Sequence, residues 1–162
     1  MQRKYVALLR AISNLPMLPF RAALEELGFA DVVSYGMSGN LMFNATGIAR
    51  ATLEKKIARR LDLEVFVRTR ADIARAVSSN PYAGERGAAV MFLDRAPAAA
   101  RRSALAAMDV QGDPAVVRGR MVFFRYPLHL VGRRGNIDVE KVLAVRGTMR
   151  AESVVEGILA RM

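Results

Sequence analysis

The tripeptide Ser38-Gly39-Asn40 places a hydroxyl and a carboxamide on one short turn. Both groups donate and accept hydrogen bonds, so a turn at the end of a sheet could present them to a polar ligand. The same residues are typical of an ordinary tight turn, because glycine adopts positive φ freely and asparagine tolerates the left-handed region. Ser38 and Asn40 are therefore candidate ligand-binding residues, with turn chemistry as the alternative.

Isolated arginines provide a second possible site. Arg10 follows directly after the apolar run Tyr5–Leu9, and Arg150 stands near the other end of the sequence. A planar guanidinium can hold a phosphate or a carboxylate with two parallel hydrogen bonds. The alternative for Arg10 is an ordinary ion pair at the end of a strand, with Glu25 or Glu26 as its partner.

The most basic segment is 114–137, which contains five arginines, the single histidine His129 and no acidic residue. Arg133, Arg134 and Asn136 lie at the start of an expected helix, and the N-terminus of a helix attracts anions. These three residues are candidate ligand-binding residues. The alternative is an ordinary solvated loop.

Catalytic chemistry has little support in the sequence. The absence of cysteine removes disulfides, thiol nucleophiles and cysteine-ligated metals, and one histidine cannot form a multi-histidine metal site. No serine or acid stands at a meaningful spacing from His129, and neither standard phosphate-binding glycine motif is present. We therefore expect no cofactor and no metal, and we assign no catalytic residue.

Charge gives only general support for a nucleic-acid partner. The net charge is +10, but it is evenly spread, at +5 in residues 1–80 and +5 in residues 81–162. Arginine supplies 21 of the 25 basic residues, so a compositional bias would also explain it. The run Arg118–Phe124 begins like the RNA-recognition signature, yet Arg120 and Val122 stand where that signature needs aromatic rings. Core packing is the better interpretation of that run.

The sequence predicts a cytoplasmic protein with no membrane partner. Its longest apolar run is Ala88–Leu93, far shorter than the ~20 residues that span a bilayer. Arg10 interrupts the first apolar stretch, so no secretory signal is expected. The lack of cysteine fits a reducing compartment.

Apolar spacing predicts the same order of elements in both halves. In the first half, strands are expected at Tyr5–Leu9, Val32–Tyr35, Leu41–Phe43 and Val65–Val67, with helices at Phe20–Leu27 and Leu53–Leu61. In the second half we expect a strand at Ala88–Leu93, a helix after Pro97, a hairpin at Ala115–Val117 and Met121–Tyr126, and two helices at Asp138–Val145 and Thr148–Arg161.

This order predicts an α+β fold of two ferredoxin-like (α/β plait) halves, each an antiparallel sheet with helices on one face. The first half would cover residues 1–68 (βαββαβ) and the second residues 82–162 (βαββαα). A connecting helix over 69–81 would begin with a capping box formed by Thr69 and Asp72. The hairpin glycines Gly39 and Gly119 lie 80 residues apart in matching positions.

These motifs, taken in order along nearly the whole chain, resemble the domain-of-unknown-function family 1697. The matching segments are Tyr5–Arg10, Leu24–Phe29, Ser38–Asn40, Val67–Thr69, Asn80-Pro81, the Arg-Gly-Arg hairpin before Tyr126-Pro127, and Thr148–Arg150. The resemblance implies a pair of plait-like halves and implies no activity, because none is established for the family.

Two segments depart from the family pattern. Family members follow the first strand with Gly-Ile-Asn-Val-Gly-Gly and a lysine-bearing loop, whereas this chain has the shorter segment Ala11–Pro16. The closing Arg-Asn-Trp-Asn of the family is here Arg150–Ser153. A ligand that needs those groups would therefore be bound differently here or not at all.

Three functions remain open from the sequence. The first is a binding module for an anionic ligand, nucleic acid or nucleotide, that uses Arg10, the 133–136 loop and Arg150. The second, weaker hypothesis is an enzyme that uses Ser38, Asn40 and arginines on a small phosphorylated or acidic substrate. The third is a self-associating protein with no small ligand, because plait halves have sheet edges that can pair between chains. The chain could be a monomer or a homodimer.

Overall fold

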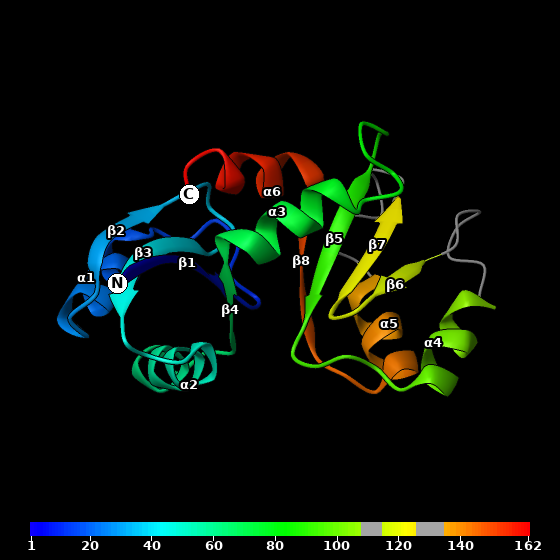
Figure 1. Cartoon of the computed structure of the whole chain (residues 1–162), viewed down its shortest axis with the longest axis horizontal. Helices are drawn as coiled ribbons and strands as arrows, with labels where there is room; N and C mark the ends of the chain where they lie inside the picture. The colour runs from blue at the N-terminus through cyan, green and yellow to red at the C-terminus, as the bar shows by residue number, and fades with distance from the viewer. Residues whose placement is uncertain (108–114, 126–134) are drawn as a thin grey trace. The chain divides into compact units, whose positions relative to one another are not determined.

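The computed structural model describes residues 1–107, 115–125 and 135–162, with the side chains of 135–138 outside the described part. In these residues helices and strands follow one another in an order that occurs twice (Figure 1). The first elements are β1 (Gln2–Leu9), α1 (Leu18–Glu26), β2 (Ala30–Ser34), β3 (Asn40–Thr46), α2 (Arg50–Leu61), β4 (Val65–Thr69) and α3 (Arg70–Ser78). The same order follows in β5 (Ala88–Leu93), α4 (Ala99–Ala106), β6 (Val116–Arg118), β7 (Met121–Arg125), α5 (Gly135–Leu143), β8 (Gly147–Ala151) and α6 (Glu152–Leu159).

The chain divides into two compact units. Unit 1 consists of Met1–Arg75 with Glu156–Met162, and unit 2 of Ala76–Val155. Helix α3 carries the chain from unit 1 into unit 2, and α6 returns it to unit 1. The final seven residues therefore group with the beginning of the chain, although they are far from it in sequence.

The sheet of unit 1 has the strand order β2-β3-β1-β4, with every neighbouring pair antiparallel. One face carries Tyr5, Ala7 and Leu9 from β1, which form a core cluster with Leu24 of α1 and Leu53 of α2. The opposite face of β1 is also buried, at Val6 and Leu8. Burial on both faces explains why β1 is a continuous apolar run rather than an alternating one.

Unit 2 repeats this arrangement with the order β6-β7-β5-β8. Its neighbouring strands are also antiparallel. Met91 and Leu93 of β5 belong to a core cluster with Leu105 of α4 and Leu143 of α5. The two equivalent sheets confirm the predicted α+β class and its two ferredoxin-like halves, each with helices packed on one sheet face.

The structure contradicts the expectation that the final helix begins at Thr148. Thr148–Ala151 belongs to strand β8 and not to the final helix, which begins only at Glu152. β8 pairs with β5, so that Arg150 lies opposite Val90 and Gly147 opposite Leu93. The second half therefore repeats the whole βαββαβ order before α6, instead of ending in two successive helices.

The capping box at the start of α3 is confirmed. The backbone N–H of Asp72 donates to Thr69 Oγ1 at 3.1 Å, and the backbone N–H of Thr69 donates to Asp72 Oδ2 at 3.0 Å. This reciprocal pair satisfies two backbone donors that the helix leaves unpaired and turns the chain directly from β4 into α3.

Among the described residues, no helix has both the length and the apolar composition needed to cross a membrane.

The C-terminal residues are held within unit 1 by Tyr35, which follows β2. The guanidinium carbon of Arg161 lies 4.2 Å from the centre of the Tyr35 ring, and Lys4 Nζ donates to the Arg161 carbonyl at 2.8 Å. Gly157 packs so closely that a Cβ atom there would stand 2.1 Å from the Tyr35 hydroxyl oxygen. A glycine is therefore needed at this place in a helix, where it would ordinarily be unfavourable.

We predict that Gly157→Ala lowers the free energy of unfolding by about 1–3 kcal/mol, because the added methyl group overlaps the Tyr35 ring. On an unobstructed helix the same change would stabilise by about 1 kcal/mol. Urea unfolding of Gly157→Ala, Tyr35→Ala and the double variant measures the coupling between the two positions. If Gly157→Ala costs as much in the Tyr35→Ala background as in the unmodified chain, this explanation is contradicted.

Candidate functional site

The Ser38-Gly39-Asn40 turn makes its hydrogen bonds within the hairpin. Asn40 is fully buried, and its Nδ2 donates to the Tyr35 carbonyl at 2.9 Å and to Ser38 Oγ at 3.1 Å. Gly39 has φ +76°, and a Cβ there would lie 2.8 Å from Leu9 Cβ. These contacts support the turn interpretation, and a ligand-binding role for Ser38 and Asn40 stays a prediction.

Replacement of Asn40 tests the structural role of the turn. Asn40→Ala should lower the free energy of unfolding by about 1–3 kcal/mol, because the Tyr35 carbonyl loses a buried donor. Ser38→Ala should cost less, since Asn40 keeps its bond to Tyr35. Thermal and urea unfolding of both variants provide the comparison. Equal effects of the two changes would contradict the assignment of the main contact to Asn40.

Arg10 forms an ion pair, but not with the residues that the sequence suggested. Its Nη1 binds Glu64 Oε2, and its backbone N–H donates to the Glu64 carbonyl at 3.0 Å. Glu64 lies between α2 and β4, so the pair joins the end of β1 to the start of β4. The expected partner Glu26 instead binds Arg60. Arg10 is thus engaged within the sheet end, and its role as a ligand-binding residue stays a prediction.

Arg150 is one of two buried arginines at equivalent places in the two units. Arg68 of β4 pairs with Val6 and is 2% exposed, while Arg150 of β8 pairs with Val90 and is 5% exposed. Each donates through Nη1 at 2.8 Å to the carbonyl of the preceding residue in its own strand. Arg68 also lies 3.8 Å from Glu54 Oε2.

Burial lowers the pKa of Arg150 to about 10, because an apolar surrounding disfavours the charged form. The guanidinium is still a cation at pH 7 in both the folded and the unfolded chain. The resulting burial penalty is present below pH 10 and is relieved as pH rises toward the ordinary arginine pKa. Arg150 also donates to Thr148 Oγ1 at 2.8 Å, a second bond within β8.

The other predicted site residues lie outside the part of the chain that the structure describes. These are Arg133, Arg134, the side chain of Asn136, and His129. Their assignment as ligand-binding residues stays a prediction from the sequence. Among the described residues, no group of three or more histidine, aspartate or glutamate side chains is placed to hold a metal ion.

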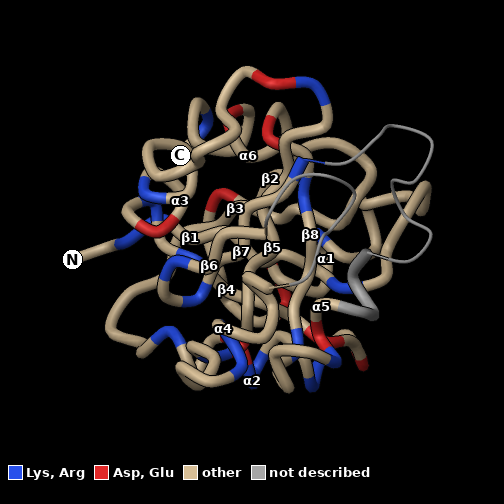
Figure 2. The backbone as a smooth tube through the Cα atoms, turned by 90° about the vertical axis from the view of Figure 1, so that its right-hand side faces the viewer, with Lys and Arg blue, Asp and Glu red and all other residues tan. Residues whose placement is uncertain are grey.

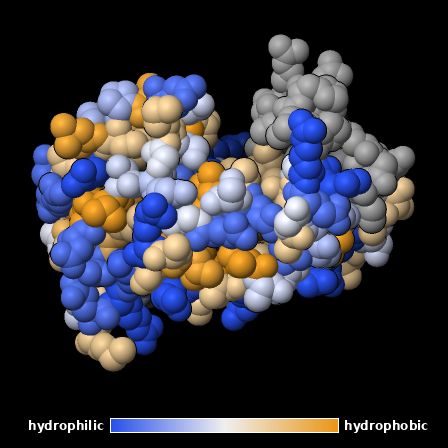
Figure 3. All heavy atoms as spheres, turned by 90° about the horizontal axis from the view of Figure 1, so that it is seen from above, coloured by the Kyte–Doolittle hydropathy of each residue, from blue (hydrophilic) through white to orange (hydrophobic). Residues whose placement is uncertain are grey.

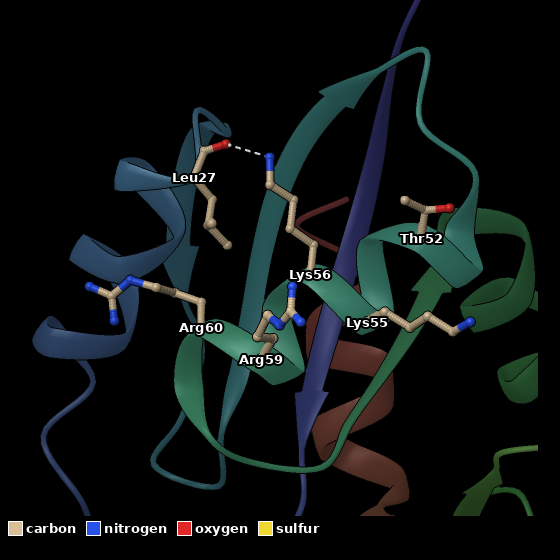
Figure 4. A pocket seen from close by; sticks show the side chains of 6 residues that line it. All are labelled: Leu27, Thr52, Lys55, Lys56, Arg59 and Arg60. Atoms are coloured by element: carbon tan, nitrogen blue, oxygen red, sulfur yellow. Dashed lines mark hydrogen bonds between the residues drawn. The ribbon is translucent and has the colours of Figure 1, made fainter.

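A basic hollow that the sequence analysis did not single out lies along α2 (Figure 4). We call it the α2 hollow. It has a volume of about 750 Å³ and is lined by Leu27, Thr52, Lys55, Lys56, Arg59 and Arg60. The pattern of charges between Leu53, Ile57 and Leu61 indicates only an amphipathic helix. Since many helices expose charges without binding anything, the spacing alone could not identify the hollow.

Packing fixes the helix that carries these cations. Leu53 and Ile57 are fully buried on its inner side, one helical turn apart. Glu54 Oε2 accepts the backbone N–H of Val67 at 2.9 Å and lies 3.4 Å from Arg50 Nη1. The helix ends at Asp62, which adopts the left-handed conformation with φ 53°. The basic side of α2 therefore faces away from the side that is packed into the core.

The four cations of the α2 hollow differ in their partners. Arg60 extends toward α1, where it binds the Glu26 carboxylate (Figure 4). Lys56 donates from Nζ to the Leu27 carbonyl at 3.2 Å and lies 5.5 Å from the centre of the Phe29 ring. The side chains of Lys55 and Arg59 have no hydrogen bond or ion pair within the described residues. Both are exposed, so two cations are available to an anion without breaking a contact.

A smaller hollow of about 200 Å³ adjoins the same α1–β2 turn. Leu27 lines both hollows, and the smaller one also includes Gly28, Phe29, Thr46 and Ile48. Neither hollow is lined by Arg10, Asn40 or Arg150, and a pocket shared by these three residues would have favoured the enzyme hypothesis.

The chain matches the family described as "Protein of unknown function (DUF1697)" over residues 1–123. That match covers all of unit 1 apart from its C-terminal residues, and unit 2 as far as β7. The chain belongs to this family. The family resemblance found in the sequence is thus confirmed, although two of the motifs quoted for it, Tyr126-Pro127 and Thr148–Arg150, lie beyond the matched residues.

A solved structure supports the fold of this DUF1697 protein. The conserved bacterial protein SP0830 from Streptococcus pneumoniae is 15% identical, with a TM-score of 0.70 over 99% of this chain and 98% of that one. At this identity the likeness concerns the fold alone. None of the curated proteins matches the chain.

Proposed function

We propose that this DUF1697 protein is a binding module for an anionic ligand of the nucleic-acid class, and that the ligand binds at the α2 hollow. The observation that carries the proposal is that Lys55, Lys56, Arg59 and Arg60 all line one open hollow. Within the described residues, Glu26 is the acid that pairs with one of them, Arg60. Such a surface attracts phosphates, and the counterions of the neutralised phosphates are released into solution.

The charge distribution of the chain explains why a local hollow matters more than the net charge. Basic residues occur along much of the backbone trace (Figure 2). Many of them are engaged by acids or carbonyl groups, as Arg10 is by Glu64 and Arg95 is by Asp94. Lys55 and Arg59 differ because they line the hollow without such a partner among the described residues. The proposal therefore concerns four cations and not the whole surface.

The alternative functions have less support. An enzyme would need reactive groups brought together, and the two hollows contain no nucleophile with an adjacent base among the residues that line them. Self-association would be favoured by one large apolar patch, whereas the face in Figure 3 shows hydrophobic residues as separate spots among hydrophilic ones. The oligomeric state, monomer or homodimer, stays a prediction, as does the cytoplasmic location.

Neutralising the two unpaired cations tests the proposal. Lys55→Gln with Arg59→Gln should weaken binding to mixed-sequence DNA and RNA and reduce the slope of log K against log salt by about 1.8 for a DNA duplex. The matched control is Arg101→Gln with Arg102→Gln on α4, which removes the same charge from an exposed helix in unit 2. Fluorescence anisotropy at several salt concentrations gives both quantities. The same loss in both double variants would show that only net charge matters.

Glu26→Gln should strengthen binding, because the change frees Arg60 for the ligand. One further phosphate contact would steepen the salt slope by about 0.9 for a DNA duplex. Glu25→Gln is the control, since it removes the same charge from the adjacent exposed position, where no ion pair with a described residue is present. Binding that responds equally to both substitutions would contradict a specific competition by Glu26.

A further inference from the structure

We infer that the nucleic acid held at the α2 hollow is a double helix, contacted through its phosphate backbone and not through its bases. This inference rests on the proposed function and adds to it the structural class of the ligand. It is carried by the hydrogen-bonding character of the hollow, the arrangement of its cations and the composition of its lining.

The side chains of the α2 hollow are suited to phosphate oxygens. Lysine and arginine only donate hydrogen bonds, and phosphate oxygens only accept them. Base edges present donors as well as acceptors. Lysine and arginine can contact the acceptors of guanine, but distinguishing all four base pairs also requires side chains that accept. Thr52 is the one lining side chain with an acceptor oxygen. The hollow therefore matches a backbone and lacks the mixed chemistry that distinguishes one base from another.

The cations form two short rows along α2. Lys55 and Arg59 make one row and Lys56 and Arg60 the other, because residues four apart lie on the same side of a helix. From residue 55 to 60 the axis rises about 7.5 Å at ~1.5 Å per residue. This length corresponds to two or three phosphates of one strand, at ~3.4 Å per charge along the axis of a duplex. The rows thus fit a short stretch of a rigid, regularly charged backbone.

The lining lacks the exposed aromatic rings on which the bases of a single-stranded nucleic acid would stack. Proteins that bind single strands without sequence preference stack bases on exposed aromatic rings. The lining residues include no aromatic side chain, and the nearby Phe29 is 6% exposed beneath Lys56. A flexible strand would have to become ordered on this surface without stacking to offset the lost entropy. A duplex is already ordered and carries twice the charge per unit length.

The test compares a mixed-sequence DNA duplex of about 20 base pairs with each of its separate strands, using the full chain and several salt concentrations. An RNA duplex of the same sequence forms a further arm. We expect both duplexes to bind about tenfold more tightly than either strand at the same low salt. The DNA duplex should show a salt slope of about −2.7, for about three phosphate contacts, since Glu26 occupies Arg60.

Thr52→Trp provides a complementary variant, because it adds an aromatic ring to the lining. It should raise the affinity for the single strands about tenfold, as expected for one stacked base, and leave the duplex affinity within about twofold. Thr52 is exposed, so the folded structure should tolerate the change, and circular dichroism checks this.

The possible results distinguish a failure of the duplex preference from a failure of nucleic-acid binding itself. Single strands that bind as tightly as the duplexes would overturn the duplex inference and leave nucleic-acid binding intact. The absence of salt-sensitive binding by every nucleic acid at tens of micromolar protein would overturn the proposed function itself. Duplex binding that persists unchanged in Lys55→Gln with Arg59→Gln would move the site away from the α2 hollow and overturn the inference as well.

Discussion

The Glu54 carboxylate fixes helix α2 to the edge of the unit 1 sheet, and the basic hollow depends on that attachment. Its Oε2 accepts the N–H of Val67 in β4 and lies between Arg50 of its own helix and the buried Arg68. A half-buried carboxylate is stable here because a backbone donor and two guanidinium groups compensate its lost hydration. With its inner side fixed in this way, α2 must turn its lysines and arginines outward. The outward position of these cations thus depends on Glu54 together with the buried Leu53 and Ile57.

The order of helices and strands could largely be inferred from the sequence, because the spacing of apolar residues shows which faces of an element are buried. Tyr5–Leu9 and Ala88–Leu93 are continuous apolar runs, and both are central strands buried on both faces. Thr69 and Asp72 predicted a helix start by their spacing, since a capping box depends only on local chemistry. The sequence of strand β8 contains no comparable signal. Gly147 and Ala151 are poor strand formers, and their place is set by pairing with β5.

The candidate site was harder to infer because it depends on which charges have partners. The sequence drew attention to Arg10, but pairing across 54 residues with Glu64 engages it. From the sequence, the cations of α2 are typical of a solvated helix face. In the folded chain Leu27 completes the lining of the hollow, and Glu26 competes with a ligand for Arg60. Charge type and helical spacing are local properties. The availability of a charge is a property of the folded chain.

The contact between Arg161 and Tyr35 has a consequence for the order of events during synthesis. Unit 1 contains residues 1–75, yet it also contains residues 156–162, which are synthesised after the whole of unit 2. Its sheet can pair while unit 2 is still being translated, because β1 to β4 are all within that first stretch. The space beside Tyr35 is filled only when Gly157 and Arg161 have been synthesised. Unit 1 is therefore completed only after the residues of unit 2 have been synthesised, and until then the Tyr35 ring lacks its contact with Arg161.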